Sequence, residues 1–303
     1  MRSMTKIAAW LLPLLFVAPT VSAQQMPAEY AGVLKTLNRQ GDYKDNVLKV
    51  NIPRNDLKVS IHGIATPTAF GFGGWIAMTK GTGGRDVMMG DLVLTEDQVN
   101  PVMSALLDNG LQVTALHNHF FWDEPHVFFM HVHGTGSAAD LAAKVKPALD
   151  LITKAPGTTP AGSAAAPKAP ADLDTAKLAK IVGHQGEQNG AVYKITVGRD
   201  DVKLTEMGAP INARMGLNTW AAFVGTNDKA AVAGDVAMLA DEVQPVLKAL
   251  RKHGLDVVAI HQHMLATNPT IYFLHYWGTG PADTLAAGFK AALDQLGRGA
   301  KRK

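Results

Sequence analysis

The chain has 303 residues, a hydrophobic fraction of 47%, a charged fraction of 18% and a formal net charge of +3. This length allows two domains of about 100–200 residues or one large domain, and the composition is that of a globular protein with a buried core. The small net charge, without a basic stripe interleaved with aromatic residues, argues against a nucleic-acid partner. The chain has no cysteine, so any metal ion has to be held by His, Asp, Glu, Met or backbone groups.

Residues 1–23 have the pattern of a secretory signal peptide. Arg2 and Lys6 precede an apolar run from Ile7 to Val17, and a small-x-small motif ends at Ala23. The apolar run is shorter than the roughly 20 residues that a membrane-spanning helix needs. We therefore expect cleavage near Ala23, no membrane span in the mature protein, and a periplasmic or secreted location.

The remainder of the chain contains an internal repeat. Asp91 matches Asp235 at an offset of 144 residues, within the segments "GDLVLTEDQVNPVMSALLDNGLQVTALHNH" and "GDVAMLADEVQPVLKALRKHGLDVVAIHQH". Upstream, "LKVNIPRNDLKV" matches "YKITVGRDDVKL" at an offset of 145. The repeat predicts a first unit at 28–152 and a second unit at 173–297, able to pack on each other. Between them lies a Pro/Ala/Gly-rich linker at 153–172, and a basic tail follows at 298–303.

Periodicity predicts the same elements in each unit. The first unit is expected to contain a helix at 28–39, a hairpin of strands at 47–52 and 57–61, strands at 74–79 and 87–94, a helix at 95–110, strands at 111–120 and 127–133, and a closing helix after Ser137. The second unit opens with a helix at 175–182. This order predicts an α+β fold of two tandem homologous units, each a mostly antiparallel sheet with helices packed on one face.

Two His-x-His pairs flank the turn in "ALHNHFFWDEPHVFFMHVHGTG". Side chains alternate along a strand, so His117 and His119 share one face, as do His131 and His133. If the hairpin is centred next to Pro125, His117 lies opposite His133 and His119 opposite His131. Four imidazoles on one patch predict a transition-metal site, because imidazole suits zinc and copper.

The second unit keeps only part of this pattern. His261, His263 and His275 match three of the four histidines, whereas Trp277 stands where the first unit has His133. Three interpretations follow. Both units bind metal through the shared trio, or only the first unit keeps full ligation, or the trio is structural.

Carboxylates in the same segments are further candidates. Asp91 and Asp235 recur in the repeat and would complete a shell of three histidines and one carboxylate. In "GD" at a strand bend, however, such an aspartate also serves as a local turn residue. Glu124 lies in the turn between the two His-x-His pairs. There it would be a general base beside a metal-bound water, or simply a polar turn residue.

The blocks "LLDNGLQVTALHNHFFWDEPHVFFMHVHGTG" and "LRKHGLDVVAIHQHMLATNPTIYFLHYWGTG" resemble the LppY/LpqO family of bacterial envelope proteins. The resemblance spans both units and implies an exported domain, and no catalytic residue is carried over from it. The absence of cysteine departs from the lipoprotein members of that family.

Three hypotheses remain open at this point. The first is an exported protein that binds zinc or copper through the histidine hairpins. The second is a metal-dependent hydrolase that uses the same histidines and Glu124. The third is a non-metal module that binds a small-molecule ligand, with the histidines as polar lining.

Overall fold

The computed structural model describes residues 24–153 and 172–297. The expected signal peptide and basic tail, and all but the two ends of the expected linker, lie outside these residues. Among the described residues, no helix is both long and apolar enough to cross a membrane.

The first unit is a six-stranded sheet in the order β1-β2-β5-β6-β9-β7, and each neighbouring pair is antiparallel. Its helices are α1 (Ala28–Leu37), α2 (Glu96–Asp108) and α3 (Ala138–Thr153). Its sheet strands are β1 (Asp42–Lys44), β2 (Val47–Pro53), β5 (Gly73–Lys80), β6 (Asp86–Thr95), β7 (Gln112–His117) and β9 (Val127–Gly136). Between β2 and β5 the chain forms β3 (Val59–Ile61), β4 (Ile64–Thr66) and the short 3-10 helix η1 (Thr68–Phe70), while η2 (Thr82–Gly84) precedes β6 and β8 (Asp123–Glu124) precedes β9.

The second unit repeats this arrangement in the order β10-β11-β14-β15-β17-β16. Its helices are α4 (Thr175–Val182), α5 (Val243–Lys252) and α6 (Ala282–Leu293). Its strands are β10 (Gly186–Asn189), β11 (Val192–Gly198), β14 (Asn218–Gly225), β15 (Ala230–Met238), β16 (Asp256–His261) and β17 (Tyr272–Gly280), with β12 (Thr205–Glu206), β13 (Ala209–Pro210) and η3 (Ala213–Met215) between β11 and β14. The model therefore confirms the predicted α+β class and the two tandem units.

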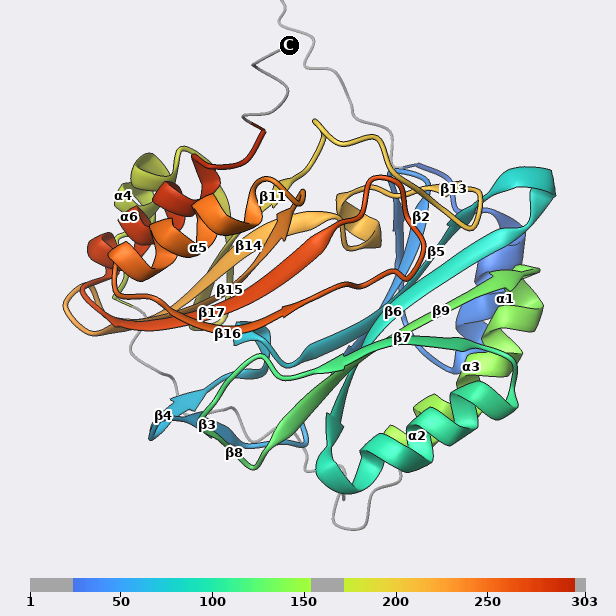
Figure 1. Ribbon diagram of the computed structural model, residues 1–303. Coiled ribbons are helices and arrows are strands. Elements are labelled where there is room, and N and C mark those ends of the chain that lie inside the picture. The colour runs from blue at the N-terminus through green and yellow to red at the C-terminus, as the bar shows by residue number, and fades with distance from the viewer. Residues whose placement is uncertain (1–23, 154–171, 298–303) are drawn as a thin grey trace, which may run out of the picture.

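Alternating strands explain how each sheet presents two different faces. In β9, Met130 and Val132 are buried with the helices of the first unit, whereas Phe129 belongs to a cluster shared with the second unit. Each set of three helices covers the outer face of its own sheet (Figure 1). The inner faces of the two sheets are left to pack toward each other.

Each unit packs part of one segment on the other unit: the segment between β2 and β5 in the first unit, and that between β11 and β14 in the second. η1 of the first unit packs on β11 and β14, and η3 of the second unit packs on β2 and β5. Two hydrophobic clusters consequently contain residues of both units: Met89 packs with Met215 and Phe273 in one, and Phe70 with Trp277 in the other. This reciprocal packing makes the two units one structure with a pseudo-two-fold relationship.

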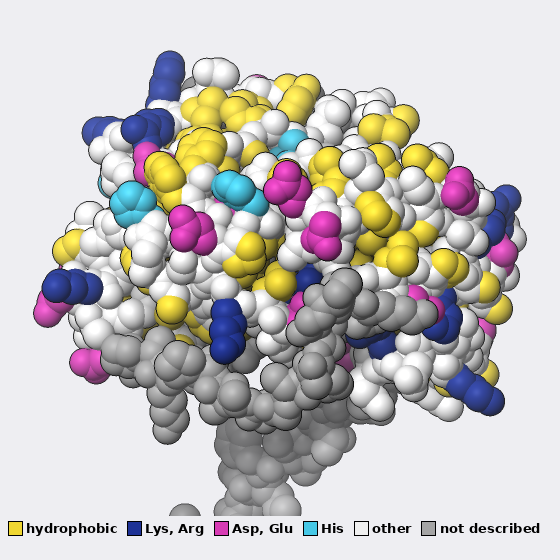
Figure 2. Space-filling model, turned by 90° about the horizontal axis from the view of Figure 1, so that it is seen from below, with side chains coloured by type: hydrophobic (Ala, Val, Ile, Leu, Met, Phe, Trp, Pro, Cys, Tyr) yellow, Lys and Arg dark blue, Asp and Glu magenta, His cyan; other side chains and the backbone are white. Residues whose placement is uncertain are grey.

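One predicted strand pairing is wrong. The expected hairpin of 47–52 and 57–61 does not form, because β2 pairs with β1 and β5 while β3 pairs with β4 and β8. The chain instead leaves the main sheet after β2, and η1 of this segment packs on the other unit. The face seen from below in Figure 2 carries hydrophobic side chains interspersed with acidic and histidine side chains.

Candidate metal centre

Six histidines, three from each unit, meet between the two sheets and are called the histidine cluster here. The rings of His117 and His261 stack with centroids 3.6 Å apart, and two further cross-unit pairs have centroids at 3.7 and 3.8 Å. The six members are His117, His119, His131, His261, His263 and His275. The repeat makes His119 equivalent to His263 and His131 equivalent to His275. The pair His119–His275 is therefore equivalent to the pair His263–His131, as a pseudo-two-fold relationship requires.

Strand alternation and strand ends place these rings. His131 follows Met130 in β9, so it points away from the helices and toward the other unit. His117 is the last residue of β7, and His119 lies two residues beyond it. The ring of His119 stacks on Phe129 at 3.3 Å, and its equivalent His263 stacks on Phe273 at 3.3 Å. An aromatic ring therefore closes each end of the cluster.

The register of the hairpin differs from the prediction. His117 pairs with Phe129 and Ala115 pairs with His131, so neither expected histidine-to-histidine pair forms. The cause is the turn: His117 pairs with Phe129, so the hairpin is centred on Asp123 and not next to Pro125, and an irregularity between Val113 and Ala115 shifts the register by one further residue along β7. The equivalent shift occurs in β16 between Val257 and Ala259. The histidines converge because the other unit supplies half of them, and not because four of them face each other across one hairpin.

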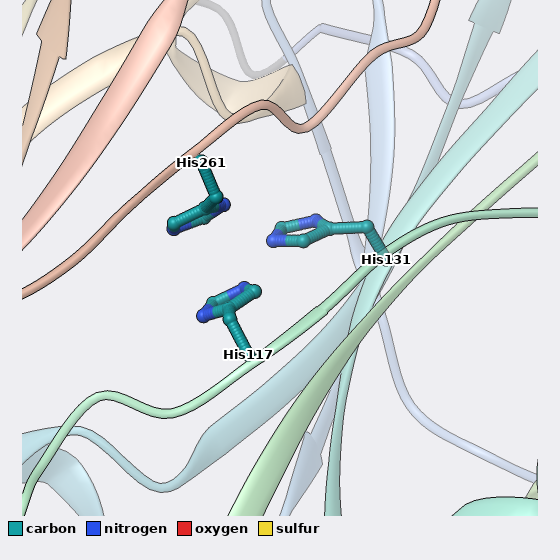
Figure 3. Close-up of side chains that lie close together, drawn as sticks. All are labelled: His117, His131 and His261. Carbon is teal, nitrogen blue, oxygen red and sulfur yellow. The ribbon is translucent and has the colours of Figure 1, made fainter.

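Two groups of three histidines bring their ligand nitrogens within 4.8 Å of one another. One group is His117, His131 and His261, from β7, β9 and β16; the rings of His117 and His261 are stacked, and that of His131 is directed toward them (Figure 3). The other group is His117, His119 and His275. Each group draws ligands from both units. Three nitrogens at about 2.0–2.1 Å from one tetrahedral ion lie about 3.3–3.4 Å apart, so small ring rotations have to close each group.

Burial keeps the histidine cluster uncharged. It lowers the pKa of His117 from 6.5 to about 2 and that of His261 to about 4, and the neighbouring ring of His261 adds to the effect on His117. Burial followed by the other rings holds the pKa of His119, His131, His263 and His275 well below 6.5. Neutral imidazole is the form that binds metal ions, so the site is prepared for a cation without proton loss near pH 7.

Each of the six rings has a buried Nε2 without a hydrogen-bond partner among the described residues. Backbone groups also orient two of the rings. His131 hydrogen-bonds to the backbone of Gly90, and Nδ1 of His275 lies 3.4 Å from the carbonyl oxygen of Gly234, the equivalent glycine. An imidazole that donates Nδ1–H to a carbonyl presents the Nε2 lone pair to a metal ion. Both rings therefore have the arrangement of a supported ligand.

His133 is not brought into either ligand group. It is fully buried, and its Nδ1 lies 3.3 Å from Oε1 of Glu206 in the second unit. Glu206 aligns with Ile61, and His133 aligns with Trp277. Ile61 and Trp277 lie together in a hydrophobic cluster, so the two units use a polar pair at one place and an apolar pair at its equivalent. This explains why the repeat departs from itself at His133.

Asp91 and Asp235 lie beside the histidine cluster and outside both ligand groups. Asp91 pairs with His131 across the sheet, Asp235 pairs with His275, and Asp235 Oδ2 is 4.0 Å from His263 Nε2. Burial raises the pKa of Asp91 to about 7, opposed by Lys49 and Lys194, and burial raises that of Asp235 well above 3.8. The expected shell of three histidines and one carboxylate is therefore not assembled, and the carboxyl groups form a neighbouring polar layer.

Two lysines complete that layer, and sequence reasoning did not single them out. Lys49 lies 4.6 Å from the centroid of Trp75, and Lys194 lies 3.9 Å from that of Trp220. Burial lowers the pKa of each lysine to about 8. The available signal was their recurrence in the repeat at the same offset as the tryptophans. Thr114 was also missed; its Oγ1 donates to the carbonyl oxygen of His263 at 2.6 Å, and no sequence pattern marks it.

Glu124 is exposed in β8 and pairs with Ser60 of β3. It belongs to neither ligand group. Nδ1 of the nearby His126 lies 3.3 Å from Oδ1 of Asp123, and the side chain of His126 is 62% exposed. Glu124 thus lies where a polar turn residue is expected, and its position gives no support to a role as general base at the histidine cluster.

The model of the family described as "Domain of Unknown Function (DUF1259)" matches residues 31–151 and again residues 176–295. The chain belongs to this family. Its two copies of the DUF1259 domain are the two units whose histidines meet, so the cluster lies between domains of one family. No curated protein matches the sequence.

The solved structures that are similar to this chain include EtuB and PduB. EtuB from Clostridium kluyveri has 12% sequence identity and a TM-score of 0.22, with 87% of this chain and 93% of that chain covered. PduB, a trimeric bacterial microcompartment shell protein, has 13% identity and a TM-score of 0.21, with 84% and 92% covered. These scores are too low to carry an inference about ligands or assembly.

Proposed function

We propose that this DUF1259 protein binds a transition metal, zinc or copper, in the histidine cluster between its two units. The observation that carries the proposal is the set of six buried Nε2 atoms that have no hydrogen-bond partner among the described residues. A buried polar atom without a partner costs about 1–3 kcal/mol. An ion that accepts these lone pairs removes that cost, whereas packing alone leaves it in place.

The alternative of a purely structural aromatic stack is less favourable. Phenylalanine would stack equally well at the six positions without buried nitrogens to satisfy, as Phe129 and Phe273 do beside His119 and His263. The repeat instead places a histidine at every one of these positions in both copies. Ligands drawn from two elements of one unit and one of the other fit an ion that also ties the units together.

Imidazole ligands favour zinc, copper, nickel or iron over calcium and magnesium, which prefer oxygen donors. The cysteine-free chain offers no thiolate to compete. The signal-peptide pattern of residues 1–23 and the resemblance to LppY/LpqO envelope proteins support a location outside the cytoplasm. The proposed role is therefore to store or deliver the ion, or to be structured by it, in the cell envelope.

The test is metal analysis of the mature protein, purified without a histidine tag and without nickel resin. We expect bound zinc or copper, and its loss from the variant that combines His117→Ala with His131→Ala. The matched control is His126→Ala, which removes an exposed histidine outside both groups. Unchanged metal content in the double variant would overturn the proposal.

A further inference from the structure

Building on the proposed function, we propose that the histidine cluster holds two transition-metal ions, each bound by three histidines from both units. One ion takes His117, His119 and His275. The other takes His261, His263 and His131. Each ion thus receives the adjacent His-x-His pair of one unit and the single strand histidine of the other unit.

The first argument is the relationship between the two sets. Adding the repeat offset to His117 and His119 gives His261 and His263, and the partner of His275 is His131. Ring centroids within the first set are 5.2, 5.0 and 3.7 Å apart. Those within the second set are 5.1, 5.9 and 3.8 Å apart. The second set is not among the groups whose ligand atoms lie within 4.8 Å of one another, so it needs a larger ring movement than the first set to hold an ion.

The second argument is the number of donors. A zinc or copper ion in a protein commonly takes three or four ligands, so one ion would leave at least two buried Nε2 atoms unsatisfied. Two ions with three imidazoles each satisfy all six. Every ion then keeps an open position for water or a small oxygen-donor ligand, as in sites where three protein ligands hold a reactive zinc.

A competing two-ion arrangement would share one ring. Both nitrogens of His117 are buried without partners, and His117 belongs to both groups whose ligand atoms lie within 4.8 Å. A bridging His117 would serve both groups and would leave Nε2 of His263 unsatisfied. It would also treat the equivalent residues His117 and His261 differently. The unshared arrangement leaves Nδ1 of His117 without a partner, but it satisfies every Nε2 of the cluster and preserves the repeat, so we favour it.

The experiment counts ions in the complete mature chain. The protein is stripped with a chelator, loaded with zinc, separated from free zinc and measured by native mass spectrometry and elemental analysis. We expect two ions per chain in the original protein and in the His126→Ala control. We expect one ion in His119→Ala, one in His263→Ala and one in His117→Ala, with none in the variant that combines His119→Ala with His263→Ala.

The outcomes separate the possibilities. One ion in the original protein overturns this inference and leaves the proposed function standing, whereas no ion overturns both. Two ions in the original protein, with none in His117→Ala and two in His263→Ala, would replace the unshared arrangement by the bridged one. Where an alanine variant fails to fold, His119→Gln and His263→Gln repeat the count with side chains closer in size, and circular dichroism checks their fold.

Discussion

His117 of the first unit and His261 of the second stack across the unit interface with ring centroids 3.6 Å apart. They are equivalent positions of the repeat, so the pseudo-two-fold axis passes between them. Each is also the middle member of its own unit's trio, with ring centroids about 5 Å from both neighbours: 5.2 and 5.2 Å around His117, and 5.1 and 4.9 Å around His261. A centre built this way needs both copies of the domain, because each ligand group contains a residue from each unit.

Metal removal should lower the stability of the protein. An ion that binds only the folded state adds about 2.7 kcal/mol when its free concentration is 100 times its dissociation constant. We therefore expect the Tm of chelator-treated protein to rise by several degrees when zinc is added, measured by calorimetry. The variant with His117→Ala and His131→Ala should show no such rise, whereas His126→Ala should behave like the original protein. An equal rise in all three proteins would point to binding elsewhere.

The metal-free protein should lose stability as the pH falls below about 6.5. Burial lowers the pKa of all six histidines of the cluster below 6.5. The unfolded chain therefore takes up protons that the folded protein does not, starting near pH 6.5. Each net proton of this kind lowers the free energy of unfolding by about 1.4 kcal/mol per pH unit.

Two carboxyl groups act in the opposite direction. The pKa of Asp91 is raised from 3.8 to about 7 and that of Asp235 is also raised, so the folded protein holds protons there that the unfolded chain releases. Their contribution is lost as the pH rises between about 4 and 7. Six histidines outnumber two carboxyl groups, so the free energy of unfolding should rise with pH between pH 5 and pH 7. Urea unfolding in chelator at pH 5.0, 6.0 and 7.0 measures it, and equal stability at these pH values would contradict the assignment.

Particular residues show how far sequence reasoning reaches. Alternation placed His131 on the strand face opposite the helices, and the repeat identified His261, His263 and His275 as the counterparts of His117, His119 and His131. The model brings these six together. The packing of one unit on the other could not be predicted from the sequence. A repeat shows which residues are equivalent, but it does not show which faces of the two units contact each other. The partner of His133 could not be predicted for the same reason, because Glu206 lies in the other unit, 73 residues away in the sequence. Its only trace was two departures from the repeat, at His133 and Glu206.

Thr114→Val should lower both the stability of the protein and its affinity for zinc, because it removes a hydrogen bond that supports the backbone of His263. Thr114 Oγ1 donates to the backbone carbonyl oxygen of His263 at 2.6 Å, in a buried contact between the units. Valine keeps the shape and leaves that carbonyl without this donor, which costs about 1–3 kcal/mol. We expect a lower free energy of unfolding and weaker zinc binding, both measured by titration. Thr114→Ser keeps a hydroxyl and should retain most of both, and a variant as stable as the original would show that the contact contributes little.

The His133–Glu206 pair should stabilise the unit interface without affecting metal binding. Both side chains are buried, at 0% and 7% exposure, and His133 Nδ1 is 3.3 Å from Glu206 Oε1. Glu206→Ile removes the partner of His133 and should cost about 1–3 kcal/mol of unfolding free energy. Adding His133→Trp should recover part of that loss, because Ile61 and Trp277, the equivalent residues, lie in one buried hydrophobic cluster. A double-mutant cycle from urea unfolding gives the coupling. The zinc content should be the same in all four proteins, and its loss on changing His133 alone would return this residue to the list of ligands.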